Sequence, residues 1–344
     1  MEQHNHRPDG KEVLLAHGSG GRSMHQLVDG LIVPALANPL LDRMEDQATL
    51  EINGLRLGFT TDSFVVDPIF FPGGDIGALA VNGTVNDLAM GGARPLYLSL
   101  SFILEEGLAL AELERILASI RAAAAISGVQ IVTGDTKVVH RGSADKVFIN
   151  TAGVGLMTDG TRISAAGAQV GDRILLSGSL GDHGMAIMSR REGFEFEAAI
   201  ESDTAGLWPL VDAMLAAAPG AVHAMRDPTR GGLASCLNEI AQRSGVGMRL
   251  QEAAIPVHEP VRGACEMLGL DPLYVANEGK LMAVVQPEHA ERVLAAVRTH
   301  PLGREAQLVG TVVEDTRHLV VMETAFGGSR IVDLLAGDPL PRIC

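Results

Sequence analysis

The segment TTDSFVVDPIFFPGGDIGALAVNGTVNDLAMGGARP, residues 60–95, joins the end of a strand-like run, a glycine-rich turn and a helical pattern. Asp62 closes the apolar run, and Asp75 stands directly before the expected helix. The helix has an apolar face formed by Val81, Val85, Leu88 and Ala89. Asp87 is therefore expected to point away from the core. The segment predicts a strand, a turn and a helix with acidic side chains near one edge of a sheet.

On either side of this segment the chain alternates between apolar runs and helical patterns. Strands are predicted at 55–61, 96–104, 129–133, 147–157, 173–178, 281–286 and 306–313. Helices are predicted from Leu110 to Ile120 with Gly128 as C-cap, from Leu207 to Leu215, and from Leu233 to Ala241 with an end near Gly245. A chain of 344 residues is long enough for two domains, and the turn-rich segment 158–172 is the best boundary between them.

Composition narrows the class of protein. A formal net charge of −15 argues against nucleic acid or an anionic membrane as partner. We see no apolar run long enough to span a membrane and no signal peptide. The three cysteines, none in a CxxC motif, indicate a reducing cytoplasm without disulfides. Cys236 and Cys265 are expected to be small packing residues, whereas Cys344 is the last residue of the chain.

Acidic residues recur where strands end and glycine-rich loops begin. They are Asp62, Asp87, Asp135 and Asp227. One aspartate in such a place is most often a helix cap or a turn residue. Four in similar settings favour a shared site, because carboxylates gathered at one sheet edge repel one another unless a hard cation neutralises them. Mg²⁺ held by carboxylates and substrate phosphates is the cation that this pattern indicates.

The glycine-rich segment HGSGGRSMHQLV, residues 17–28, is a second candidate for phosphate binding. Gly18, Gly20 and Gly21 allow backbone N–H groups to converge on an anion, and the helix expected after them would help. The segment matches neither the GxxxxGK[ST] nor the GxGxxG nucleotide motif. A flexible turn explains it equally well.

Together with the segment 60–95, four further motifs occur in order along the chain. They are TGDTKVVHRGSADKVFINTAG, DPTRGG, ANEGKL and the terminal PRIC. From about residue 13 to 344 the sequence resembles the HypE family of hydrogenase maturation carbamoyl dehydratases, within the aminoimidazole ribonucleotide synthetase superfamily. The resemblance implies two α+β domains. It also implies that strands of the N-terminal domain form a barrel across a homodimer, with ATP in a cleft between the domains.

The resemblance also implies a function. The partner HypF would place a carbamoyl group on the sulfur of Cys344, and the protein would use ATP to dehydrate it to a thiocyanate. The cyanide would then pass to iron on the HypC–HypD complex, for a [NiFe] hydrogenase.

Roles for individual residues follow from the same resemblance. The residues assigned to Mg²⁺ and the ATP phosphates are Asp62, Asp87, Asp135 and Asp227. The further ATP-binding residues are Gly18, Gly20, Gly21 and Asn86. Lys137 would face the phosphoryl group or the carbamoyl oxygen, and Glu278 would be the general base. A surface lysine and a strand-edge glutamate are the alternatives for these two residues.

The expected organisation has four parts. They are an N-terminal segment with the glycine-rich loop at 1–40, an ATP-binding and dimerisation domain at 41–160, a C-terminal α+β domain at 161–333, and a flexible tail at 334–344. Pro339 and Pro341 favour an extended tail, and at about 3.3 Å per residue its ten residues after Leu334 would span roughly 30 Å. Arg342 and the α-carboxylate act in opposite directions on Cys344, so no strongly depressed thiol pKa is expected.

Two other functions stay open at this point. One is a different ATP-using superfamily member that phosphorylates a small molecule and gives the tail no role. The other is a carrier or scaffold without catalysis. Substitution of Cys344 would leave the activity of such a kinase unchanged. Hydrolysis of ATP by the protein would exclude a carrier or scaffold without catalysis.

Overall fold

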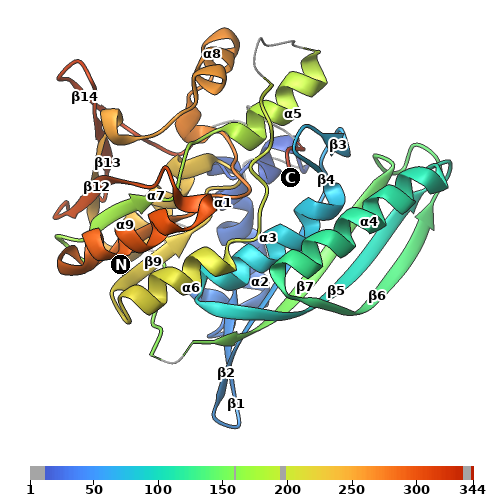
Figure 1. Ribbon diagram of the computed structural model, residues 1–344, viewed down its shortest axis with the longest axis horizontal. Coiled ribbons are helices and arrows are strands. Elements are labelled where there is room, and N and C mark those ends of the chain that lie inside the picture. The colour runs from blue at the N-terminus through green and yellow to red at the C-terminus, as the bar shows by residue number, and fades with distance from the viewer. Residues whose placement is uncertain (1–11, 159, 194–198, 336–341) are drawn as a thin grey trace.

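The computed structural model describes residues 12–158, 160–193, 199–335 and 342–344 (Figure 1). Two sheets of five and seven strands lie side by side, each with helices packed against it. This arrangement confirms the predicted α+β class. Among the described residues, no helix is long and apolar enough to cross a membrane.

The first sheet has the strand order β1-β2-β7-β5-β6, and only the β5–β6 pair is parallel. Its strands are β1 (Ala48–Ile52), β2 (Leu55–Phe64), β5 (Ala93–Glu105), β6 (Gln130–Val139) and β7 (Val147–Met157). Burial alternates along β7, as expected for a strand with one face on a core. In β6 nearly every residue is exposed. The described part of this sheet is open, with β1 and β6 at its edges, and it closes no barrel.

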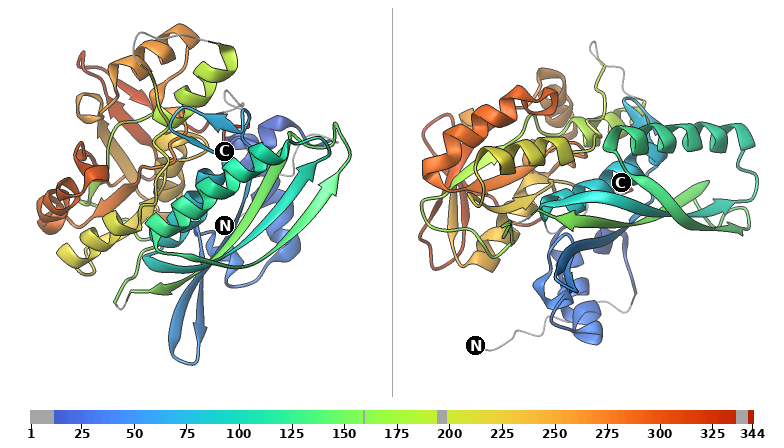
Figure 2. Two further views of the ribbon diagram at one scale, coloured as in Figure 1. Left: turned by 45° about the vertical axis from the view of Figure 1, so that its right-hand side comes forward. Right: turned by 60° about the horizontal axis from the view of Figure 1, so that its bottom comes forward.

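Helices α3 (Ile76–Met90) and α4 (Leu110–Ser127) cover one face of the first sheet (Figure 2). The side chain of Asp75 caps α3 by accepting the N–H groups of Gly77 and Ala78. Gly128 ends α4 in the left-handed conformation, as predicted. A two-stranded hairpin of β3 (Phe70–Phe71) and β4 (Gly74–Asp75) leads into α3.

The second sheet has the order β14-β13-β10-β12-β8-β11-β9. Its strands are β8 (Arg173–Leu176), β9 (Val222–Arg226), β10 (Gly247–Gln251), β11 (Met282–Val285), β12 (Gln307–Val313), β13 (Val320–Glu323) and β14 (Ser329–Ile331). The second domain contains the helices α5 (Asp182–Glu192), α6 (Trp208–Ala217), α7 (Gly232–Ser244), α8 (Glu259–Leu268) and α9 (Ala290–Thr299), of which α5 and α8 pack in the apolar cluster of the first sheet. Helix α7 packs in one apolar cluster with the second sheet, whereas α6 and α9 form another with alternate residues of the same strands.

Short helical turns complete the described chain. The N-terminal segment contains Leu15–Gly18, α1 (Arg22–Leu27), the π-helical turn Val28–Ile32, α2 (Val33–Leu36) and Leu41–Arg43. The second domain adds the turns Glu252–Ala254, Pro272–Tyr274, Pro287–His289 and Pro301–Gly303. Pro339 and Pro341 of the expected extended tail lie outside the described residues.

Candidate functional site

A cavity of about 370 Å³ lies where the N-terminal segment, the first sheet and the second domain meet. Its charged and thiol-bearing lining residues are Glu45, Asp46, Asp62, Asp87, Arg226, Asp227, Arg230, Cys236, Glu239, Arg243, Glu278 and Cys344. The described chain therefore brings its last residue into the same space as three of the four predicted aspartates.

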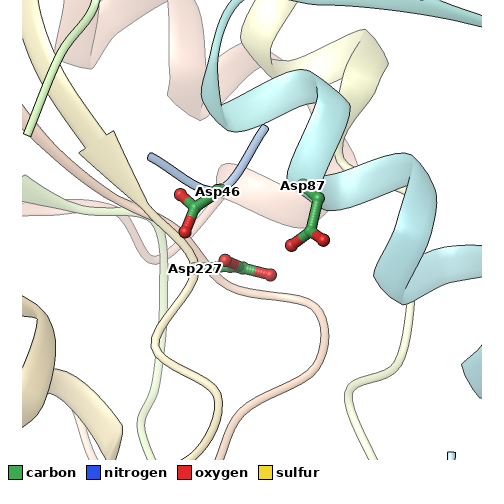
Figure 3. A group of neighbouring side chains, drawn as sticks. All are labelled: Asp46, Asp87 and Asp227. Atoms are coloured by element: carbon green, nitrogen blue, oxygen red, sulfur yellow. The ribbon is translucent and has the colours of Figure 1, made fainter. Parts of the chain in front are cut away.

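Three carboxylates form the centre of this cavity. Asp46 precedes β1, Asp87 lies on α3, and Asp227 follows β9. One oxygen of each lies within 4.8 Å of those of the other two (Figure 3). Burial raises the pKa of Asp227 to about 6. Burial, with the nearby charges of Asp227 and Asp62, raises the pKa of Asp87 well above its usual value.

This carboxylate set fits a hard cation. All of its donor atoms are carboxylate oxygens, which Mg²⁺ prefers. The raised pKa values of Asp87 and Asp227 show that their negative charges are unfavourable without a counter-ion. Arg226 supplies part of the positive charge that these carboxylates need, since its guanidinium forms an ion pair with Asp46 and lies 3.6 Å from Glu239. Thr60 donates a 2.8 Å hydrogen bond to Asp87.

The loop around Glu278 is held by its neighbours. The backbone N–H of Glu278 donates to Asp203 at 3.0 Å, and Lys280 donates to the other oxygen of Asp203 at 3.1 Å. On the other side, Asn86 donates to the Glu278 carbonyl at 3.2 Å. Asn277 ties the loop to the 227–230 turn by donating to the Pro228 carbonyl. The backbone of Glu278 is therefore fixed on both sides.

The carboxylate of Glu278 has an unused acceptor. The side chain is 2% exposed, and its Oε1 has no hydrogen-bond partner among the residues that the structure describes. Burial, followed by the charges of Asp227 and Asp203, raises its pKa well above the usual value, while Arg230 opposes the shift. Once ionised, this carboxylate is a stronger base than a solvated glutamate, and it can accept an N–H from a molecule in the cavity.

The C-terminal residues 342–344 dock against the first domain. The backbone N–H of Val65 donates to a backbone oxygen of Cys344 at 3.1 Å, and the backbone N–H of Asp67 donates to the Arg342 carbonyl at 3.2 Å. The Arg342 guanidinium lies 2.5 Å from Asp145 and 3.2 Å from Asp67. Ile343 is 4% exposed within the core that α3 and α4 share with the first sheet. Both ionic and apolar contacts thus bring Cys344 to the cavity.

The docked thiol of Cys344 is not activated. Burial raises its pKa, the charges of Glu278 and Asp62 raise it further, and only the guanidinium of Arg230 lowers it. The expectation that this pKa is not depressed is confirmed. In the docked position the sulfur is a protonated thiol, which is a poor nucleophile and a poor acceptor of a new group.

Of the three glycines expected to bind phosphate, only Gly20 lines the cavity. It has a φ of +75°, and a Cβ at this position would meet the Arg230 carbonyl oxygen. Ser235 also donates to the Gly20 carbonyl at 2.8 Å. The loop therefore packs against the 227–231 turn, and Gly18 and Gly21 are not among the lining residues.

Three expected site residues lie elsewhere in this chain. Asp135 and Lys137 are exposed on β6 and pair with each other at 2.6 Å. They lie outside the cavity because the edge strand β6 is separated from β2 by β5 and β7. Asn86 is buried, and its amide bonds the carbonyls of Ala205 and Glu278 and the N–H of Leu207. This set of bonds uses both ends of the amide to join the loops at Ala205–Leu207 and Glu278.

Sequence reasoning missed Asp46, Arg226 and Arg230. Asp46 lies before a strand, whereas the predicted site aspartates were identified at the ends of strands. Its usable signal was the acidic pair Glu45-Asp46 directly before the apolar alternation of β1. Arg226 and Arg230 flank Asp227 inside the segment RDPTR. The sequence analysis placed this segment in the site through Asp227 but assigned no role to the two positive charges.

Comparisons with known proteins show which sequences and structures this chain resembles. Residues 44–157 match the family model of the AIR synthase related protein N-terminal domain, and residues 169–323 match that of its C-terminal domain. The sequence is 60% identical over 332 residues to the carbamoyl dehydratase HypE of Azotobacter vinelandii, which covers 96% of this chain and 97% of that protein. The crystal structure of a HypE–HypF complex is similar with a TM-score of 0.86 and 46% identity, over 90% of this chain and 99% of that chain. The crystal structure of HypE in complex with ATP has a TM-score of 0.81 and 51% identity, over 97% of this chain and 100% of that chain.

Proposed function

The chain belongs to the carbamoyl dehydratase HypE family, and we propose that it dehydrates a carbamoyl group carried on its own Cys344 to a thiocyanate, with ATP as co-substrate. The observation that carries this proposal is the position of Cys344 in the same cavity as Glu278 and the Asp46–Asp87–Asp227 cluster. A kinase acting on a small molecule would not need the chain terminus there. ATP-dependent dehydration of a carbamoylated Cys344 tests the proposal.

The reaction can be written in two balanced steps. The carbamoyl oxygen attacks the γ-phosphorus of ATP while one N–H proton leaves, and ADP departs. The second N–H proton then leaves, the C–O bond breaks to release phosphate, and the C≡N bond forms. The oxygen that is lost from the carbamoyl group leaves in the phosphate. Glu278 is the base for these protons, because its buried Oε1 lacks a partner and its pKa is raised.

The cavity also holds the charged groups that phosphoryl transfer from ATP requires. Asp46, Asp87 and Asp227 would hold Mg²⁺, which would neutralise negative charge on the ATP phosphates. Arg230 lies among Cys344, Asp62 and Glu278, and it would keep the carbamoyl end of the tail and the phosphate close together. Asp62, half-buried on β2, would contribute to the same phosphate site.

Changing Asp87 to Asn should weaken Mg-ATP binding by about tenfold or more, because it removes one ligand charge, and a tenfold change corresponds to about 1.4 kcal/mol. In the parent protein, Mg-ATP should raise the melting temperature because it binds only the folded state. Thermal-shift titrations with Mg-ATP compare the rise in melting temperature of the parent protein with that of Asp87→Asn. Asp212→Asn, the same change at an exposed position on α6, should keep the full shift. An equal shift in Asp87→Asn would contradict this assignment.

Burial raises the pKa of the docked thiol, and we propose that loading occurs where the tail is differently placed. We propose HypF as the partner that loads it and the HypC–HypD complex as the acceptor of the cyanide. The solved HypE–HypF complex supports the first partner, and the terminal PRIC motif supports both. The three free thiols fit a reducing cytoplasm.

We propose a homodimer built on the first sheet, with residues 41–160 as the dimerisation and ATP-binding domain. The edge strand β6 leaves Ile131, Val132 and Val138 exposed, together with Tyr97 on the adjacent strand β5 and Phe59 on β2. Unpaired apolar edges are rarely left open to solvent. Continuation of the sheets into a barrel shared by two copies would cover them. The same contact would take Asp135 and Lys137 from the surface into an interface.

Val132→Lys should weaken the dimer, since it places a charge on the apolar edge strand. The chain of 36.1 kDa would then shift from about twice that mass toward the monomer in light scattering after size exclusion. Val170→Lys is the matched control, because Val170 is 60% exposed and Val132 is 59% exposed, but Val170 lies outside the first sheet. Equal masses for both variants would count against this interface.

A further inference from the structure

His183 is a buried residue that contacts the C-terminal segment. It is the second residue of α5 and is 0% exposed. Its Nε2 lies 2.7 Å from the carbonyl oxygen of Ile343, and its Nδ1 lies 2.7 Å from the Ser202 hydroxyl. Phe71 packs edge-on to the imidazole with 5.5 Å between ring centroids. The ring is thus held in place from two sides and reaches the peptide group that joins Ile343 to Cys344.

The neighbours determine which nitrogen carries the proton. A carbonyl oxygen only accepts, so Nε2 carries the hydrogen that it donates to Ile343. Ser202 Oγ accepts the N–H of Thr204 at 3.2 Å, which leaves its own hydrogen to donate to Nδ1. Burial lowers the pKa of His183, so the ring is neutral and Nδ1 is free to accept. The Thr204–Ser202–His183 chain therefore presents one fixed N–H donor to the tail.

The contact of His183 differs from the ionic contacts of the tail. Arg342 pairs with Asp67 and Asp145 in solvent, where such pairs contribute little. The His183 donor is buried and has no other acceptor for Nε2 among its hydrogen bonds in the described chain. Departure of the tail would leave this buried N–H without its partner, which is unfavourable. The hydrogen bond therefore favours the docked position of residues 342–344.

We propose that His183, oriented by Ser202, is a positioning residue that keeps residues 342–344 docked and so sets the fraction of molecules in which Cys344 lies in the cavity with Glu278. The proposal rests on the proposed role of Cys344 as the carrier of the carbamoyl group. The role of His183 is to fix the peptide carbonyl next to Cys344, without contact with the reacting atoms.

Two substitutions at this position separate hydrogen bonding from packing. His183→Leu keeps an apolar side chain in the pocket but removes the donor. His183→Gln replaces the ring by an amide whose NH₂ can reach the position of Nε2 and donate to Ile343. Ser202→Ala is a milder variant that leaves the imidazole in place but removes the group that selects its tautomer. It also keeps the proposal testable if His183→Leu does not fold.

The first measurement is the rate of alkylation of Cys344 by iodoacetamide, followed by peptide mass in the full-length, uncarbamoylated protein. Burial raises the pKa of the half-buried, docked thiol and makes it a poor nucleophile, so a faster rate reports a larger undocked fraction. Loss of a hydrogen bond worth about 1 kcal/mol predicts a rise on the order of fivefold in His183→Leu. Ser202→Ala should show a smaller rise, and His183→Gln should stay near the parent. This measurement needs neither ATP nor a carbamoyl group, so it decides the tail contact even if the dehydratase function fails.

The second measurement is single-turnover dehydration of carbamoylated Cys344. It should slow in His183→Leu and recover in His183→Gln, while the thermal shift caused by Mg-ATP stays unchanged in both. A merely structural role would lower that shift and would not be rescued by glutamine. Alkylation at the parental rate in both His183→Leu and Ser202→Ala would overturn the proposal. Faster alkylation with an unchanged dehydration rate would equally overturn the positioning role.

Discussion

Replacing Cys344 by alanine is expected to abolish carbamoyl loading and thiocyanate formation while Mg-ATP binding and the fold persist. The sulfur is the atom to which the carbamoyl group is attached, and no other thiol can replace it. Cys236 and Cys265 are buried, and burial raises the pKa of both, to about 11 for Cys265. Mass analysis after incubation with the carbamoyltransferase, its substrates and ATP measures the loading.

Cys265→Ala is the matched control for this experiment. It makes the same chemical change at a buried position on α8 that does not line the cavity. It should load and dehydrate like the parent. Transfer of a carbamoyl group to Cys236 or Cys265 in the Cys344→Ala variant would refute the assignment of the carrier.

Changing Glu278 to glutamine is expected to stall dehydration after normal loading. The substitution keeps the volume and the backbone contacts to Asp203 and Asn86, but it removes the basic oxygen. Loss of a general base typically lowers a rate by 10²- to 10⁴-fold, so a loss of roughly a hundredfold or more is expected. The accumulating species should be the carbamoylated tail, or its phosphorylated form if only the second proton transfer fails. Single-turnover mass analysis distinguishes the two.

Glu314→Gln serves as the comparison, because Glu314 is exposed and lies outside the cavity. It should dehydrate at the parental rate, and both variants should show the parental thermal shift with Mg-ATP. Dehydration by Glu278→Gln at the parental rate would exclude Glu278 as the base.

The strands and helices with a long, regular apolar pattern could be predicted from the sequence. All seven predicted strands and all three helices defined by their apolar stripes are present. Although the missed helix α9 has ten residues and a regular apolar stripe, most of the other missed elements are short or interrupted. For example, β13 has four residues, and α5 contains Gly184 in its first turn. Periodicity has too few repeats to register in such segments.

The candidate site could be predicted only in part, for reasons of topology. Asp62, Asp87, Asp227, Glu278 and Cys344 converge in the cavity as expected. Motif order along the chain cannot reveal which strand becomes an edge, and β6 takes Asp135 and Lys137 to the surface.

The missed contacts have a related cause. The contribution of Asp46 depends on packing of the N-terminal segment against the second domain through Arg226. The contact between His183 and Ile343 joins residues 160 positions apart. Neither contact leaves a local pattern in the sequence.

The most direct test of the dehydratase function is the mass of the C-terminal peptide of the carbamoylated protein before and after Mg-ATP is added. The proposed function predicts that the peptide ending at Cys344 loses the mass of one water molecule, and that one ADP and one phosphate appear for each peptide converted. A carbamoylated peptide whose mass stays unchanged while ATP is hydrolysed would contradict it.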